Sequence, residues 1–187
     1  MRMSRGDSRS SRRKSSARLA AAVAGGLWLA TSGSAPAGAQ PYEEHIVGPW
    51  KITNISDGCQ AEGEYENGMT LEIGVWANGT ERIILSNDNW KSLESRDGKR
   101  LAMVFDFDAK TIRQTGQVSG TSHFIGSFFK PQEGEESIFP IFAASSRVAI
   151  VADDKLIGRF NFTDSREAAM EVIACIRAVR AADPFAG

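Results

Sequence analysis

The chain has 187 residues, and its 22 Lys and Arg nearly balance its 23 Asp and Glu. The first 39 residues hold seven of the basic residues and one acidic residue, so the other 148 carry 15 basic and 22 acidic side chains, a net charge near −7. This acidic segment has no cluster of Lys and Arg, which argues against a nucleic-acid-binding protein. Its length fits one domain with a hydrophobic core.

Residues 1–39 are predicted to be a cleaved export signal. Basic residues precede an apolar run over residues 19–30, and Ala-Gly-Ala at residues 37–39 forms a small-residue cleavage site before Gln40. The apolar run has 12 residues, whereas a membrane-spanning helix needs about 20. We therefore expect a periplasmic or secreted domain over residues 40–187, with no integral membrane segment once the signal is removed. Adjacent arginines in the signal leave open whether export uses the general secretory or the twin-arginine route.

From Ile46 to about Phe162, apolar side chains recur at every second residue between frequent turn signals, which predicts a mainly β domain. In the clearest strand, the residues Leu101, Met103, Phe105 and Phe107 alternate with Ala102, Val104, Asp106 and Asp108. The expected fold is an antiparallel β-sandwich or partly closed barrel of about eight strands with one C-terminal α-helix. Residues 138–144 are ambiguous between a strand and a helical turn.

One hairpin is predicted with a specific register. Asn78-Gly79 lies between two apolar runs, and both residues tolerate the positive φ of a two-residue type I′ turn. A two-residue loop pairs Ile73 with Ile84 and Gly74 with Ile83. Apolar side chains then lie on both faces of this strand pair, which suits a pair covered on both sides.

A helix is predicted over about residues 165–182. There the apolar residues stop alternating and recur every three or four residues, as on one face of a helix. This face comprises Ala168, Val172, Cys175, Ile176 and Val179. In an oxidising compartment, two cysteines without a CxxC pattern predict one structural disulfide, here between Cys59 and Cys175. Two buried free thiols are the alternative.

Asn87, Asp88 and Trp90 are candidate binding residues, because they place oxygen-bearing side chains beside a large aromatic ring. Such a group suits a cation or a stacked sugar. A turn in which the tryptophan packs inward explains the same residues more simply.

Asp106, Asp108 and His123 are the other candidates. The two aspartates share one face of a strand, as a pair of hydrolytic carboxylates would, although a solvated outer face explains them more simply. His123 follows Ser122, but sequence adjacency does not make a catalytic pair. We therefore assign no catalytic residue.

No cofactor motif and no metal site is predicted, because neither His45 nor His123 lies at a ligand spacing. The run from Ser127 to Lys130 matches the SxxK pattern of penicillin-recognising enzymes. Those enzymes place the Ser and Lys one helical turn apart, whereas this run alternates like a strand.

The frame Trp50, Cys59, Asn89-Trp90 and Ala168-x3-Val172-x2-Cys175 resembles small exported proteins of alphaproteobacteria. The chain is more distantly similar to the invasion-associated protein B family, although that family usually has its paired cysteines elsewhere. The resemblance implies an exported β-rich domain and brings no catalytic residue.

Three functions remain as hypotheses. The first is a non-catalytic periplasmic module that binds an envelope protein or another envelope component. The second is a small periplasmic hydrolase or carbohydrate-active enzyme, which requires the polar candidates to converge in one cleft. The third is a lipocalin-like carrier of a small ligand, which requires an apolar cavity within the sheet.

Overall fold

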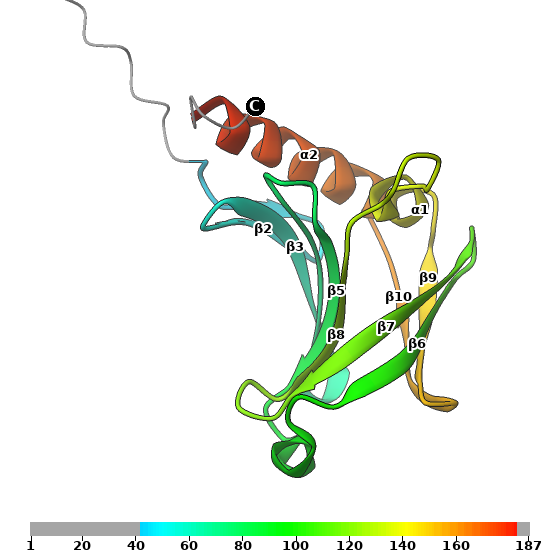
Figure 1. The fold of residues 1–187 in the computed structure, drawn as a ribbon. Coiled ribbons are helices and arrows are strands. Elements are labelled where there is room, and N and C mark those ends of the chain that lie inside the picture. The colour runs from blue at the N-terminus through cyan, green and yellow to red at the C-terminus, as the bar shows by residue number, and fades with distance from the viewer. Residues whose placement is uncertain (1–41, 183–187) are drawn as a thin grey trace, which may run out of the picture. The chain divides into compact units, whose positions relative to one another are not determined.

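A computed structural model describes residues 42–182, so the expected export signal lies outside the described residues. The described part consists of one antiparallel sheet, two α-helices and two short 3-10 helices (Figure 1). The strands are β1 (His45–Val47), β2 (Trp50–Ile55), β3 (Gly58–Tyr65), β4 (Met69–Trp76), β5 (Glu81–Asn87), β6 (Arg100–Phe107), β7 (Thr111–Ser119), β8 (Phe124–Phe129), β9 (Arg147–Ala152) and β10 (Lys155–Asn161). The helices are η1 (Glu66–Gly68), η2 (Lys91–Arg96), α1 (Ile138–Ala143) and α2 (Ser165–Ala182).

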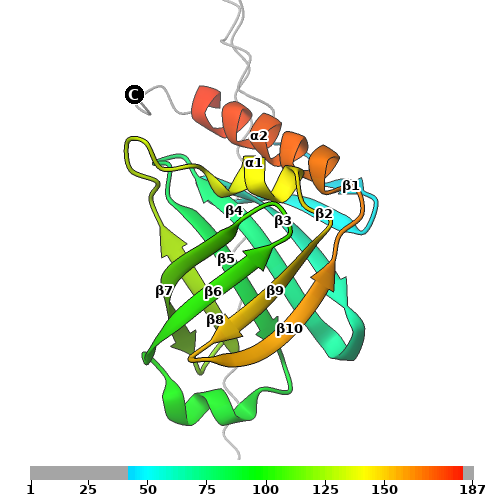
Figure 2. The same ribbon diagram turned by 90° about the vertical axis from the view of Figure 1, so that its right-hand side faces the viewer.

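The ten strands lie in the order β1-β2-β3-β4-β5-β8-β7-β6-β9-β10 and curl into a partly closed barrel (Figure 2). Side chains bridge the seam between β3 and β10. The ring of Tyr65 packs edge-on against Phe160 with centroids 4.9 Å apart, and the Tyr65 hydroxyl donates to the Asn161 carbonyl over 3.4 Å. The predicted fold class is confirmed, with ten strands instead of about eight. The short edge strand β1 was not predicted.

The inner face of the sheet carries the hydrophobic core, as the period of two predicts. On β6, Leu101, Met103, Phe105 and Phe107 are buried, while the Asp106 side chain on the outer face is exposed. The other strands contribute inner-face residues in the same way, among them Trp50, Ile52, Leu71, Ile73, Ile83, Leu85, Val148, Ile150 and Phe160.

Two helices cover one end of the curled sheet (Figure 2). Residues 138–144, ambiguous in sequence, begin with the short helix α1, whose Phe142 packs edge-on against Trp50 with ring centroids 4.9 Å apart. The Trp50 indole N–H donates to the carbonyl of Thr163, just before α2, over 2.9 Å. Helix α2 then runs across β2 and β3 with Ala168, Val172, Cys175 and Ile176 of its predicted apolar face buried and Val179 partly buried. No helix within residues 42–182 is long and apolar enough to cross a membrane.

The predicted disulfide between Cys59 on β3 and Cys175 on α2 is present, with Cα atoms 6.0 Å apart and both residues fully buried. It links an early strand to the last helix across 116 positions of sequence. The bond therefore fixes α2 over the end of the sheet that this helix covers.

The predicted register of the β4–β5 hairpin is wrong by one residue: Ile73 pairs with Ile83, and Gly74 pairs with Arg82. The loop has three residues, since the Trp76 N–H donates to the Thr80 carbonyl over 2.8 Å and Gly79 alone in the loop has positive φ, at 82°. A one-residue slip would reverse the faces of β5. The observed register directs Ile83 inward.

The same register places Arg82 on the outer face of the sheet, where its guanidinium pairs with Glu72 over 2.9 Å. The Arg82 side chain also lies over the Trp76 ring, 5.0 Å from its centroid. The outer face of this hairpin therefore carries an ion pair beside the buried apolar side chain of Ile84, so the expectation of purely apolar pairing on both faces holds only in part.

Candidate functional site

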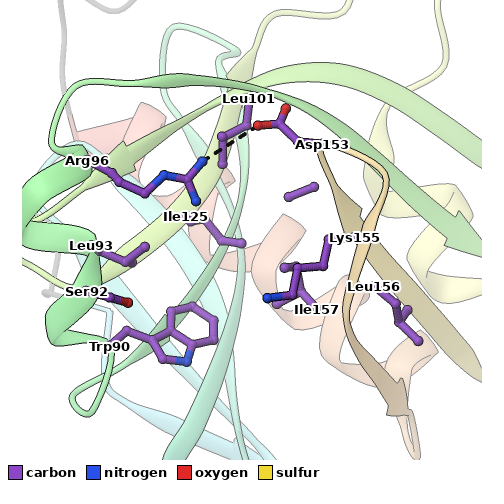
Figure 3. A pocket seen from close by; sticks show the side chains of 11 residues that line it. Trp90, Ser92, Leu93, Arg96, Leu101, Ile125, Asp153, Lys155, Leu156 and Ile157 are labelled. Atoms are coloured by element: carbon purple, nitrogen blue, oxygen red, sulfur yellow. Dashed lines mark ion pairs between the residues drawn. The ribbon is translucent and has the colours of Figure 1, made fainter.

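A cavity of about 350 Å³ lies between η2 and the β9–β10 turn (Figure 3). These two segments lie at the end of the sheet away from α2 (Figure 2). Four segments that are distant in sequence meet there: the region from Trp90 through η2, the start of β6, the start of β8 and the β9–β10 hairpin. The lining residues are Trp90, Ser92, Leu93, Arg96, Leu101, Ile125, Ala152, Asp153, Lys155, Leu156 and Ile157.

The inner face of the sheet forms the floor of this cavity. Leu101, Ile125 and Ala152 belong to β6, β8 and β9, and all three are buried core residues that also line the cavity. Further along β6, Met103 and Phe105 are fully buried and fill the interior. The cavity is therefore a shallow mouth above a packed core.

Leu156 and Ile157 are both wall residues, although neighbouring residues of a regular strand point to opposite faces. The pairing of β10 with β9 shifts between Leu156 and Gly158, which marks a β-bulge at Ile157. A bulge adds one residue to a strand and redirects its side chains. This irregularity explains how two consecutive apolar side chains both reach the cavity.

Charged side chains lie at the rim (Figure 3). Asp153 and Asp154 have positive φ, 47° and 62°, and form the two-residue turn that follows β9. One carboxylate oxygen of Asp153 accepts the Ala102 N–H over 2.9 Å, and the other lies 3.7 Å from the Arg96 guanidinium. Lys155 directly follows the turn, and its ammonium group points into the cavity.

Of the predicted group Asn87, Asp88 and Trp90, Trp90 alone lines the cavity. Asn87 is buried at the end of β5, where its amide group donates to the Asn67 carbonyl and accepts the Asn89 N–H, each over 2.8 Å. Asp88 is exposed in the following turn. The structure thus gives Asn87 a turn-forming role and separates it from the cavity.

Asp106 and Asp108 lie near the α1 end, and each carboxylate accepts hydrogen bonds from neighbouring loop or strand residues. Thr111 donates its hydroxyl to Asp106, and Ser146 donates its hydroxyl and its N–H to Asp108, over 2.6 and 3.0 Å. The hydrogen bond from the Ser146 hydroxyl holds the pKa of Asp108 below its ordinary value. Asp106 therefore links side chains across the β6–β7 pair, and Asp108 holds the backbone at Ser146.

His123 lies in the turn before β8, near the η2 end, with φ of 47°. Its Nε2 atom is 3.4 Å from a carboxylate oxygen of Glu94 on η2. The structure therefore does not bring His123 together with Asp106 and Asp108 in one cleft.

The prediction from sequence missed Arg96, Asp153, Lys155, Leu156 and Ile157. The adjacent pair Leu156-Ile157, which interrupts the alternation of an exposed strand, is the one signal that could have indicated the wall. The two rim cations carried no local signal, because their positions depend on how η2 and the β9–β10 turn approach each other.

Among residues 42–182, no group of three or more His, Cys, Asp or Glu side chains is arranged to hold a metal ion. Comparisons with protein-family models, with curated proteins and with solved structures find no match to this chain.

Proposed function

We propose that this chain is a non-catalytic binding module, exported to the periplasm or secreted, that holds a small molecule at the mouth of its curled sheet. The observation that carries the proposal is the cavity between η2 and the β9–β10 hairpin, whose floor is one end of the apolar inner face of the sheet. Small-molecule sites commonly have about 300–1,000 Å³, apolar walls and a few polar groups, and they often occupy the mouths of barrels. The volume of the cavity, its position at the mouth of the curled sheet and its combination of apolar and charged lining residues fit this description.

The arrangement of the polar candidates favours binding over hydrolysis. A pair of carboxylates that cleaves a glycosidic bond must flank the substrate. Asp106 and Asp108 instead accept hydrogen bonds from Thr111 and Ser146, and His123 lies at the other end of the sheet. Asp106, Asp108 and His123 therefore do not converge in this cavity, whereas the hydrolase hypothesis requires them to do so.

Export is the part of the proposal that rests on the signal and on the Cys59–Cys175 disulfide, since disulfides persist in oxidising compartments. We expect the exported protein to begin at Gln40. Intact-mass analysis of protein recovered from the periplasm or medium tests this directly. A mass that retains the apolar run of residues 19–30 would show that the segment is not removed.

The binding site is tested with N-phenyl-1-naphthylamine, a neutral apolar probe whose fluorescence rises when it enters an apolar site. We expect saturable binding that Ala152→Phe abolishes, because the new ring fills the cavity. Ala149→Phe is the matched control: it makes the same change on the same strand, at a residue that does not line the cavity.

Thermal unfolding of both variants separates a blocked site from a damaged fold. If Ala152→Phe fails to fold, Trp90→Ala provides the second test, because this partly buried side chain forms a wall of the cavity. Undiminished probe binding in folded Ala152→Phe protein, or equal loss in Ala149→Phe, would refute this cavity as the binding site.

A further inference from the structure

The charge at the rim of the cavity differs from that of the domain as a whole. Residues 40–187 carry a net charge near −7, yet the side chains that line the cavity include two cations, Arg96 and Lys155, and one carboxylate, Asp153. The Asp153 carboxylate already accepts the Ala102 N–H and lies within ion-pair distance of Arg96. The positive charge that Asp153 does not offset at the rim of the cavity is therefore that of Lys155.

Lys155 has no carboxylate within 4.0 Å of its ammonium group among the residues that the structure describes. Its side chain extends into the cavity beside Ile157, across from the Trp90 ring (Figure 3). An ammonium group at the edge of an apolar wall is a suitable partner for a ligand that is apolar along its body and anionic at one end.

We propose that the ligand of this cavity is a free amphipathic anion, with a short apolar or aromatic body and one carboxylate-like group. This inference rests on the proposed binding function and adds the chemical class of the ligand. The body lies against Leu93, Leu101 and Ile125, and the anionic group lies at the rim near Lys155 and Arg96. The volume of about 350 Å³ limits the body to a short chain or a small ring system.

Three probes with the same apolar body test the charge of the ligand: octanoate, octanol and octylamine. Each is titrated against the probe-bound exported domain, and displacement of N-phenyl-1-naphthylamine gives its affinity. We expect octanoate to bind about tenfold more tightly than octanol, because two partly exposed cations each add a modest ion-pair contribution. Octylamine should bind most weakly, and about 0.5 M sodium chloride should reduce the difference between octanoate and octanol.

Lys155→Met tests the residue that we place closest to the anion, since methionine keeps an apolar stem and removes the charge. We expect the dissociation constant for octanoate to rise about threefold to fivefold, while that for octanol stays unchanged. Lys91→Met is the matched control: Lys91 is exposed on η2 and does not line the cavity. This control should leave both affinities unchanged.

An anionic lipid headgroup presents the same chemistry as octanoate, so co-sedimentation with phosphatidylglycerol vesicles distinguishes the two sources. We expect no vesicle association. Association with vesicles in the absence of octanoate binding would overturn the assignment of a free ligand.

Failure of this inference differs from failure of the proposed function. If octanol binds as tightly as octanoate, or if Lys155→Met and Lys91→Met have the same effect, the anionic class is wrong while the cavity remains a binding site. If the wild-type domain binds neither N-phenyl-1-naphthylamine nor any octyl compound, the proposed binding function fails, and the ligand class fails with it.

Discussion

The two ends of the curled sheet are built from the same alternating strands but are covered in different ways. At one end, α1 and the 18-residue helix α2 bury their apolar faces on the sheet, and a disulfide joins α2 to β3. The rings of Trp50, Phe142 and Phe162 pack edge-on against one another there. At the other end, the six-residue helix η2 buries a single side chain, Leu93.

This difference assigns the two ends different roles: the α2 end holds the fold together, and the η2 end is available to bind a ligand. At the α2 end, a long helix packs its continuous apolar face against the inner face of the sheet and covers it. A short 3-10 helix reaches only part of the opposite mouth, so Leu101, Ile125 and Ala152 face a hollow. We therefore expect substitutions at the α2 end to change stability strongly and substitutions at the η2 end to change mainly binding.

The largest effect is expected for the disulfide at the α2 end. Replacing Cys59 and Cys175 together with Ser should lower the free energy of unfolding by about 4 kcal/mol, because the bond closes a loop of more than a hundred residues. Urea denaturation of the oxidised wild type and the double variant measures this loss. Probe binding at the η2 end should persist in folded variant at low temperature. If stability is unchanged, the bond does not fix α2 on the sheet.

Gly79→Val should have the next largest effect, about 1–2 kcal/mol, because valine is strained at a φ of 82°. This turn lies at the α2 end, where the Ala77 carbonyl accepts a hydrogen bond from Arg180. The nearest atom to an added Cβ is Lys130 Cε at 3.7 Å, so the expected loss comes from the backbone and not from a clash. Gly79→Asn is the control, since asparagine tolerates positive φ better. Equal denaturation midpoints for the valine variant and the wild type would contradict the three-residue loop.

Glu81 makes the α2 end sensitive to pH. Its side chain points inward from β5 and accepts the N–H of Ile138 at the start of α1 over 2.8 Å. Burial raises its pKa above the ordinary value of 4.5, with the hydrogen bonds from Ile138 and Ser137 partly opposing that rise. Between pH 4.5 and the raised pKa the folded state binds more protons than the unfolded state, so stability falls as pH increases through this range.

Glu81→Gln should remove part of that fall, because glutamine keeps an acceptor for the Ile138 N–H and does not ionise. Urea denaturation at a series of pH values between about 4 and 7 compares the two proteins. The variant retains Glu72, whose pKa burial also raises, so a smaller slope of the same sign should remain. Parallel profiles for the two proteins would exclude Glu81 as a source of the pH dependence.

The α2 end was more predictable from sequence than the η2 end, for a physical reason. The apolar face of residues 165–182 is a local pattern in the sequence, and the helix that it predicts is confirmed. The chain has only two cysteines, so only one intramolecular pairing was possible, and that disulfide is also confirmed. The loop at Asn78-Gly79 was assigned the wrong length, because glycine also suits the final position of a three-residue loop. The choice between the two loops depends on matching Ile73 with Ile83 across the inner face, which is a property of the whole sheet.

The binding site was less predictable because its lining comes from four separate segments. Trp90 was identified as a candidate from its neighbours Asn87 and Asp88, yet the structure places it beside residues of β6, β8 and β10 instead. Sheet curvature and the bulge at Ile157 bring these residues together, and neither follows from the local pattern of any one strand.

Leu156→Ser is the smallest perturbation of stability and the sharpest test of the difference between the two ends. Leu156 is 43% exposed at the η2 end and forms part of the cavity wall. Surface substitutions usually change stability by less than about 0.5 kcal/mol, so the denaturation midpoint should hardly move. Binding of N-phenyl-1-naphthylamine should weaken, because the wall loses apolar area and gains a hydroxyl.

Ile176→Ser provides the contrast at the α2 end: this side chain is 5% exposed, so the variant should lose stability while any folded protein keeps its probe affinity. If Leu156→Ser destabilises the domain as much as Ile176→Ser, or leaves probe binding intact, the η2 end is a structural part of the core and the division between the two ends is wrong.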